Sequence, residues 1–208
     1  MARKTPEEAA RTRQRILDAA VEVFARDGLA NATLAQISEQ AGVSRGAIYW
    51  HFKGKQDLLQ SILDEQAHPL EDAVPAGIGF QAGWQRLHED LGESISGDAP
   101  RKLSEIILHK SERTAASEPI PLRLEQLREG FMRRLQRLLA DAVASGELAA
   151  ELDIPAIGEV FQGCIGGLLF ECLQHPGAAA RKIAATLDTL LYLLQNPPGH
   201  LRLASRGP

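Results

Sequence analysis

The chain has 208 residues, 44% of them hydrophobic, and a formal net charge of −4 at pH 7. This length suffices for one or two domains with a sizeable core. The acidic balance argues against a protein that coats nucleic acid without regard to sequence, and no run approaches the ~18 uninterrupted apolar residues of a membrane span. The charged opening around Arg3 and Lys4 lacks the apolar segment of a signal peptide, so we expect a cytoplasmic protein.

Charge is unevenly distributed along the chain. Residues 1–55 hold nine Lys and Arg against six Asp and Glu, whereas residues 56–208 hold 14 against 21. The N-terminal part is basic and the rest of the chain is acidic, which indicates that only the N-terminal part binds a polyanion.

The first predicted helix has strong boundary signals. Thr5 is suited to cap it, Pro6 suits the first helical position, and Glu8 completes a capping box. An apolar face that includes Phe24 follows with helical spacing, and Gly28 ends the helix.

Two shorter helices follow and predict a helix-turn-helix. Thr33 caps the first of them, Gly42 permits the positive φ of a tight turn, and Ser44 caps the next helix, which carries Ile48. Two short amphipathic helices joined at a glycine form a helix-turn-helix if the second one fits a DNA groove.

The rest of the chain is also predicted to be helical, with no convincing strand, so the fold class is all-α. We expect an N-terminal DNA-binding domain at 1–55, a helical domain at 56–196 and a frayed tail at 197–208. A loose segment at 68–79, rich in Pro and Gly, is expected to act as a linker. Helices are expected at 56–67, 80–96, 101–112, 119–145, 155–174 and 178–195.

The third helix carries polar and aromatic side chains for which the core has no use. Arg45 is suited to a guanine edge, and Ser44 with the first amides of the helix is suited to a phosphate. The alternative is that Tyr49 and Trp50 cover the edge of a small core. The DNA-binding candidates are Thr33, Ser44, Arg45, Gly46, Tyr49, Trp50, His51 and Lys55.

A resemblance to a known family supports this interpretation. The run TLAQISEQAGVSRGAIYWHFKGKQDLL is similar, nearly residue by residue, to the signature of the TetR family of transcriptional repressors. The opening MARKTPEEAARTRQRILDAA and the later EIILHKSE resemble its AcrR-like branch, which represses multidrug efflux pumps. The resemblance implies a three-helix helix-turn-helix domain followed by a helical ligand-binding and dimerisation domain. It also implies that the DNA-binding candidates other than Trp50 meet DNA.

In such repressors the C-terminal domain encloses a ligand pocket, so apolar walls and a few polar groups are expected there. Each candidate has the alternative of being ordinary core or surface. The ligand-binding candidates are Trp84, Ser104, Glu105, Leu108, His109, Phe131, Phe161, Gln162, Ile165 and Leu169.

The last two helices have wide apolar faces that suit a dimer interface, and Gly163, Gly166 and Gly167 would allow close backbone approach. The alternative is that these helices only complete the core of the monomer. The interface candidates are Phe170, Leu173, Ile183, Leu187, Leu190, Leu191 and Leu194.

These features predict a ligand-responsive repressor that binds palindromic, double-stranded operator DNA as a homodimer. The expected target is a multidrug efflux operon, and the expected inducer is a hydrophobic small molecule. A regulator of a metabolic operon, or an activator, is the alternative.

An enzyme is not expected, because the sequence has no Gly-rich phosphate loop and no nucleophile elbow. His109 with Glu105 and Glu112 is spaced to share a helix face, but a solvated face is favoured over a metal site. No metal, cofactor or membrane partner is predicted. Cys164 and Cys172 are expected to be buried free thiols.

Overall fold

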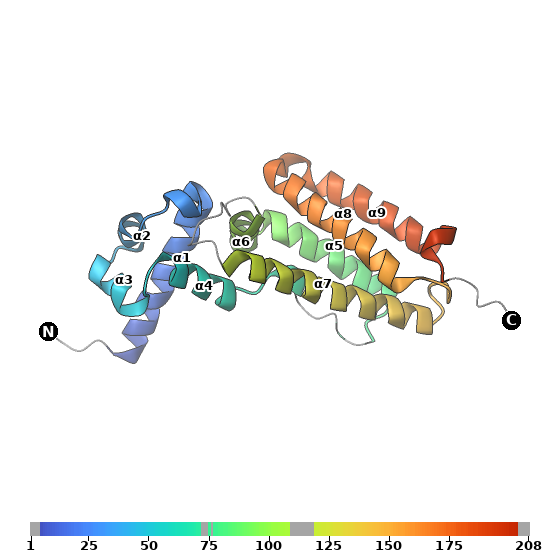
Figure 1. Ribbon diagram of the computed structural model, residues 1–208, viewed down its shortest axis with the longest axis horizontal. Coiled ribbons are helices and arrows are strands. Elements are labelled where there is room, and N and C mark those ends of the chain that lie inside the picture. Colours follow the sequence, from blue (N-terminus) through green and yellow to red (C-terminus); the bar gives the residue numbers. More distant parts are fainter. Residues whose placement is uncertain (1–4, 72–74, 76, 109–118, 204–208) are drawn as a thin grey trace. The chain divides into compact units, whose positions relative to one another are not determined.

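The computed structural model of the chain is helical, as Figure 1 shows. Within the described residues the only extended pairing is an isolated bridge between Leu152 and Arg202. The all-α class predicted from the sequence is therefore confirmed. The described residues are 5–71, 75, 77–108 and 119–203.

Packing divides the chain into two compact units. Helices α6 (Asp98–Leu108) and α7 (Pro119–Ala144) each run from one unit into the other. The N-terminal unit comprises Met1–Ala67 and Lys102–Glu125, and the C-terminal unit comprises His68–Arg101 and Gln126–Pro208.

Helix α1 (Pro6–Asn31) begins where its sequence predicts and continues past Gly28, the residue at which it was expected to end. Thr5 Oγ1 accepts a hydrogen bond from the Glu8 N–H (3.2 Å), and Glu8 Oε2 accepts one from the Thr5 N–H (3.0 Å). Gly28, with φ 77° and ψ 161°, interrupts the helix, and one further turn ends at Asn31. The capping box is confirmed, and Gly28 breaks the helix without ending it.

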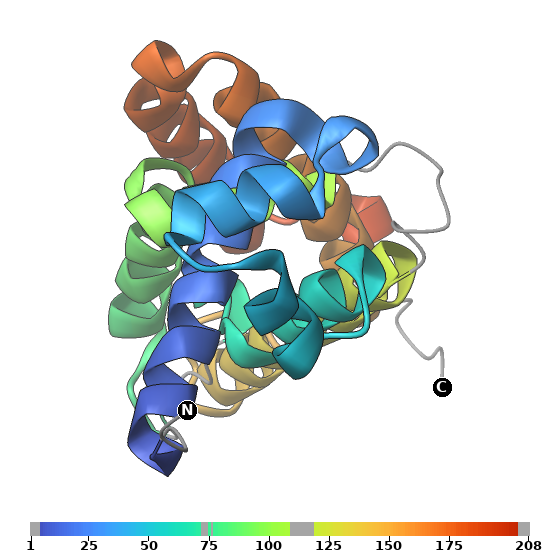
Figure 2. The same ribbon diagram turned by 90° about the vertical axis from the view of Figure 1, so that its left-hand side faces the viewer.

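Helices α2 (Leu34–Ala41) and α3 (Arg45–His51) pack on α1, and Figure 2 shows them in front of it. The turn between them has Gly42 at φ 62° and ψ 40°, as predicted. Arg15 of α1 donates a hydrogen bond to the carbonyl of Ala41, where α2 ends and its last carbonyls lack intrahelical partners. Local sequence signals and one arginine therefore fix the direction of α3.

Helix α4 (Lys55–Glu65) belongs to the N-terminal unit. The reason is apolar packing on α1, which buries Leu58 and Ile62 among other α4 side chains. Arg13 of α1 also pairs with Glu65, and this hydrogen-bonded guanidinium lowers the pKa of the Glu65 carboxyl.

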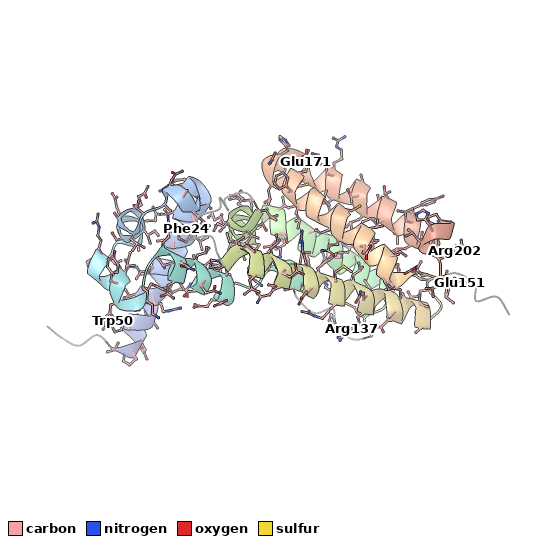
Figure 3. The ribbon with its side chains drawn as sticks, in the orientation of Figure 1. Phe24, Trp50, Arg137, Glu151, Glu171 and Arg202 are labelled. Atoms are coloured by element: carbon pink, nitrogen blue, oxygen red, sulfur yellow. The ribbon has the colours of Figure 1, made fainter. Side chains whose placement is uncertain are left out.

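The C-terminal unit is a bundle in which α5, α8 and α9 pack on one another, with most of α7 in the same unit. Gly83 marks a close approach of two helices, because a Cβ there would collide with Leu138 of α7. Lys182 of α9 pairs with Glu171 of α8 (2.6 Å), and Figure 3 labels Glu171. The helices are α5 (Phe80–Ser96), α8 (Ile154–Gln174) and α9 (Ala179–Gln195), with short 3-10 turns η1 (Pro69–Glu71), η3 (Pro176–Ala178) and η4 (Gly199–Leu201).

The tail is not frayed as far as residue 203, which corrects the sequence expectation. Leu201 is buried, and its carbonyl accepts a hydrogen bond from the Asp153 N–H (3.0 Å). The Leu203 N–H donates to the Glu151 carbonyl (2.7 Å), and Figure 3 shows Glu151 and Arg202 at the same end of the unit. Residues 201–203 are thus held by contacts to a distant loop, which local composition does not reveal.

The two cysteines differ, so the expectation that both are buried is wrong for one of them. Cys172 is buried within α8, and burial raises the pKa of its thiol. Cys164 is exposed on the same helix. α8 is long and apolar enough by composition to cross a membrane, yet only 39% of its most apolar 18-residue window is buried within the chain. It therefore combines an apolar sequence with a largely uncovered surface.

Candidate nucleic-acid interface

The outer face of α3 is uncovered and carries the predicted DNA-binding side chains. Ile48 is fully buried, whereas Tyr49 is 62% exposed and Trp50 is 72% exposed. Arg45 and Gly46 are exposed as well. These exposures contradict the alternative in which the two aromatic rings cover the edge of the core. Figure 3 shows Trp50 on α3, in contrast to the buried Phe24 of α1.

Gly46 has no packing reason to be glycine. Among the described residues, a Cβ there would meet only Ser44 Oγ, at the ordinary contact distance of 3.8 Å. Glycine inside a helix costs about 0.5–1 kcal/mol relative to alanine. The fold alone does not account for this residue, whereas close approach of an outside partner would.

Two of the candidates are N-caps of the helix-turn-helix. Thr33 Oγ1 accepts a hydrogen bond from the Gln36 N–H (3.2 Å), and Ser44 Oγ accepts one from the Ala47 N–H (3.2 Å). Both residues are exposed. Each hydroxyl therefore lies at a positive helix end, where a phosphate oxygen is favoured.

The end of α3 is an aromatic cluster backed by an arginine. The rings of Trp50 and His51 meet edge to face, with centroids 4.4 Å apart. Phe52 is buried, and the Arg13 guanidinium lies over its ring at 5.2 Å. Because Arg13 also pairs with Glu65, one side chain links the end of α3 to the end of α4.

Lys55 is placed differently from the other candidates. Its ammonium donates to the carbonyls of Leu29, Ala30 (3.4 Å) and Ala32 (3.1 Å), which end α1. Its ammonium therefore contacts the end of α1 within the protein. Lys53, two residues earlier, is exposed and was not among the predicted candidates, although it lies just beyond the C-cap of α3.

The ligand-binding candidates of the C-terminal unit form part of its core. Phe161 is 1% exposed, and its ring meets that of Trp84 edge to face at 5.8 Å. The hollow beside Phe131 has a volume of about 10 Å³, which is room for one water at most. Phe131, Ile165 and Leu169 are buried, and Gln162 is half-buried.

The remaining ligand-binding candidates fall in the N-terminal unit or outside the described residues. Ser104 is buried, and Glu105 and Leu108 are half-buried on α6. His109 and Glu112 lie outside the described residues. Within the described residues, no group of three or more His, Cys, Asp or Glu side chains is placed to hold a metal ion.

Most of the interface candidates on α8 and α9 face the core of their own unit. Only Phe170, at 46% exposure, is exposed, and Leu191 is half-buried. The sequence therefore identified the inner faces of these helices. The buried candidates are Leu173, Ile183, Leu187, Leu190 and Leu194.

The uncovered face of α8 is a stripe of small and apolar residues, hereafter the α8 stripe: Val160, Gly163, Gly167 and Phe170. Its spacing of three, four and three residues keeps it on one side of the helix. Val160 is 39% exposed, and a Cβ on either glycine would meet no atom of the described part of the chain within 4 Å. On α9, Tyr192 is 62% exposed. The glycines of α8 indicated this exposed face. The predicted interface residues on α9 were mostly leucines, and these lie on the buried face of that helix.

A helix-turn-helix with an uncovered aromatic and cationic second helix, joined to a separate helical unit, defines a class of DNA-binding transcriptional regulator. Residues 16–62 match the family described as bacterial regulatory proteins, tetR family. The transcriptional regulator SrpR of Pseudomonas putida is 39% identical over 201 residues, which cover 97% of this chain and 93% of SrpR. The chain belongs to the TetR family of bacterial regulatory proteins, and the resemblance seen in its sequence is confirmed.

Solved structures share the fold. MexZ, described as a key repressor responsible for antibiotic resistance in Pseudomonas aeruginosa, is 29% identical with a TM-score of 0.75 and covers 93% of this chain and 99% of its own. SmeT in complex with triclosan is 26% identical with a TM-score of 0.73 and covers 87% of this chain and 90% of its own. SmeT is described as the repressor of the Stenotrophomonas maltophilia multidrug efflux pump SmeDEF. These relatives are regulators rather than enzymes, as predicted.

Proposed function

We propose that this TetR-family regulator is a cytoplasmic repressor that binds a palindromic operator as a homodimer and controls a multidrug efflux operon. A hydrophobic small molecule releases it from DNA. The DNA-binding part corresponds to the domain expected at 1–55, and the ligand and dimer functions to the part expected at 56–196. The uncovered outer face of α3 is the observation that carries the proposal.

The chemistry of α3 supports recognition in the major groove. Arg45 is exposed at the first position of α3, where the N-terminal residues of a recognition helix reach base edges. A bidentate contact from arginine to guanine discriminates by about 1–3 kcal/mol. Tyr49 is suited to donate to phosphate oxygens, and Trp50 to contact thymine methyl groups or sugars. Phosphate contacts from Ser44 and Lys53 would fix the register of the helix on the duplex.

The α8 stripe supports a homodimer. Small residues allow two helices to approach closely, and Val160 and Phe170 supply apolar area at either end of the stripe. A second copy of the same stripe is its simplest complement, because two-fold interfaces use the same patch on both subunits. Two copies place two α3 helices on two half-sites, which is how helix-turn-helix dimers read palindromes.

The C-terminal core supports an apolar ligand that opens its own space. Its aromatic side chains, Trp84 and Phe161 among them, suit a hydrophobic compound, but drug-sized ligands fill about 300–1,000 Å³. The hollow beside Phe131 is far smaller, and the one beside Phe80 and Leu138, at about 170 Å³, is also smaller than that. Ligand binding therefore favours a conformation in which these helices separate, and we infer that this displaces α4 and changes the spacing of the two α3 helices. The ligand shifts this equilibrium only by its differential affinity for the two states.

Triclosan is a suitable probe, because SmeT binds it and is related over most of the chain. Fluorescence anisotropy would follow binding to labelled fragments from upstream of the protein's own gene and of any adjacent pump operon. We expect one fragment to bind in preference to random duplex and triclosan to release it. Retention of the complex at a triclosan concentration that saturates quenching of Trp84 fluorescence would refute release by this ligand.

A further inference from the structure

Two segments of the chain pass from the N-terminal unit into the C-terminal unit close to α4. The connection from α4 to η1 does so between Ala67 and His68, and α7 does so between Glu125 and Gln126. Only residues 66–68 separate α4 from η1. Any displacement of α4 relative to the C-terminal unit must therefore be absorbed in this short connection.

Buried polar contacts hold η1 within the C-terminal unit. Arg134 of α7 donates a hydrogen bond from Nη1 to the Pro69 carbonyl (3.2 Å) and pairs through Nη2 with Asp90 of α5. The side chains of Arg134 and Asp90 are each 5% exposed. His68 is buried as well, and its Nδ1 accepts a hydrogen bond from the Leu70 N–H (3.3 Å). The buried pair with Asp90 fixes the Arg134 side chain, which in turn holds the Pro69 carbonyl, and burial of Leu70 adds to the hold on η1.

A second arginine of α7 holds the end of α4 within the N-terminal unit. Arg123 donates a hydrogen bond from Nη2 to the carbonyl of Gln66 (3.3 Å). Gln66 is the C-cap of α4, and its own N–H bonds to the Ile62 carbonyl. The last carbonyls of a helix have no intrahelical partners, and a cation beside them is favoured by the helix dipole. This contact to a neutral carbonyl resembles the one to Pro69, but η1 is held in addition by the burial of Leu70 and of the neighbouring His68.

We propose that α7 controls α4 through these two arginines, with Arg134 holding η1 as a pivot and Arg123 acting as a latch on Gln66. Ligand-driven displacement of α4 breaks the Arg123 contact and leaves the Asp90–Arg134 pair intact. The regulatory consequence rests on the proposed function, in which the position of α4 sets operator affinity. Both arginines are positioning residues, because they act through α4 rather than on DNA.

Hydrogen exchange of the full-length protein tests the latch without DNA. In Arg123→Gln, we expect exchange in the last turn of α4 and the connection, residues 62–67, to rise by on the order of tenfold, as removal of one charged hydrogen bond allows. Exchange in α5 should not change. Arg123→Lys keeps a charged donor and should restore most of the protection. Arg133→Gln is the matched control, because this arginine of the same helix is 71% exposed and pairs at the surface with Glu129.

The pivot has its own test. Asp90→Asn should raise hydrogen exchange at residues 68–71 and lower the melting temperature. Arg123→Gln should leave the exchange at residues 68–71 and the melting temperature nearly unchanged. Equal effects of the two substitutions on 62–67 and 68–71 would contradict the division between latch and pivot. Unchanged exchange at 62–67 in Arg123→Gln, or a rise spread over both units, would overturn the latch.

Operator binding then tests the regulatory role separately. On a fragment that the wild type binds, Arg123→Gln should bind about three- to tenfold more weakly without ligand, and Arg133→Gln should bind as the wild type does. An Arg123→Gln variant that exchanges faster but binds the fragment unchanged would refute the regulatory role. If the wild type bound no fragment, the proposed function would fail, while the exchange result would still decide the latch.

Discussion

The outer faces of α3 and α8 are both uncovered, but their chemistry differs. α3 presents a cation and two aromatic rings with polar tips, through Arg45, Tyr49 and Trp50. The α8 stripe presents glycines flanked by apolar side chains and has no charge. A surface that donates hydrogen bonds and carries positive charge suits a polyanion, whereas a smooth apolar surface suits another helix. Two uncovered helices of one chain thus indicate two different partners.

The glycines of the chain also differ in whether internal packing requires them. Gly83 is required by packing, because a Cβ would collide with Leu138. Gly46 on α3 and Gly163 and Gly167 on α8 have no such neighbour within the described residues. Each of these three weakens its helix by about 0.5–1 kcal/mol relative to alanine. Their presence is accounted for if the partners, DNA on α3 and a second copy on α8, approach the backbone closely.

The largest effect should come from a charge placed in the α8 stripe. Gly167→Glu puts a carboxylate where two apolar helices would meet, so we expect a folded monomer by light scattering. Loss of the second recognition helix should weaken operator binding by on the order of 10²–10⁴-fold. Gly92→Glu is the control, since Gly92 also lies in a helix with nothing near its Cβ position. A Gly167→Glu protein that stays dimeric would show that the stripe is not the interface.

Arg45→Ala should have the next largest effect. We expect specific operator binding to weaken by about 1–3 kcal/mol for each half-site, with base preference flattened at one position per half-site. Binding to random duplex should change little, and Arg133→Ala should change neither. Competition titrations with operators substituted at single positions would measure this. An equal loss on specific and random duplexes would contradict base reading by Arg45.

Substitution of Lys53 should affect DNA binding, whereas substitution of Lys55 should affect the stability of the fold. Lys53→Ala should lower the slope of log affinity against log salt by about 0.9 for each phosphate that the lysine neutralises, with the melting temperature unchanged. Lys55→Ala removes the hydrogen bonds to the end of α1 and should destabilise the fold by about 1–3 kcal/mol while leaving the salt slope intact. The reverse pattern would restore Lys55 to the phosphate-binding role predicted from the sequence.

Gly46→Ala should give the smallest change, with opposite signs in two measurements. The methyl group fits the free protein and favours the helix, so urea unfolding should show a gain of about 0.5–1 kcal/mol. Operator binding should weaken, because the methyl group would stand between α3 and DNA. A stabilised variant that binds the operator as tightly as the wild type would remove the argument that DNA approaches this backbone closely.

The sequence predicted those parts of the fold that depend on neighbouring residues. The caps at Thr5, Thr33 and Ser44 and the positive φ of Gly42 involve residues at most three apart, and all are confirmed. The exposed face of α3 was predicted for a related reason. Once Ile48 is assigned to the core, helical periodicity turns Arg45 and its neighbours outward.

Contacts between distant residues account for what the sequence did not predict. Periodicity shows that α9 has an apolar face with Leu187 and Leu190, but it does not say whether the same chain or a second copy covers that face. Lys55 reaches carbonyls at residues 29–32, and the Leu201 carbonyl binds the Asp153 N–H. No local pattern distinguishes such a lysine from an exposed one, or a docked tail from a frayed one.

Repeated selection of random duplexes by the full-length protein, followed by sequencing, tests the central claim most directly. If two outward α3 surfaces read DNA in a symmetric pair, the enriched sequences will be inverted repeats, with two copies of the chain bound by sedimentation. Selection with Arg45→Ala will lose preference at one position in each half. Enrichment no greater than that of the starting pool, or enrichment of an asymmetric site bound by one copy, would contradict the account.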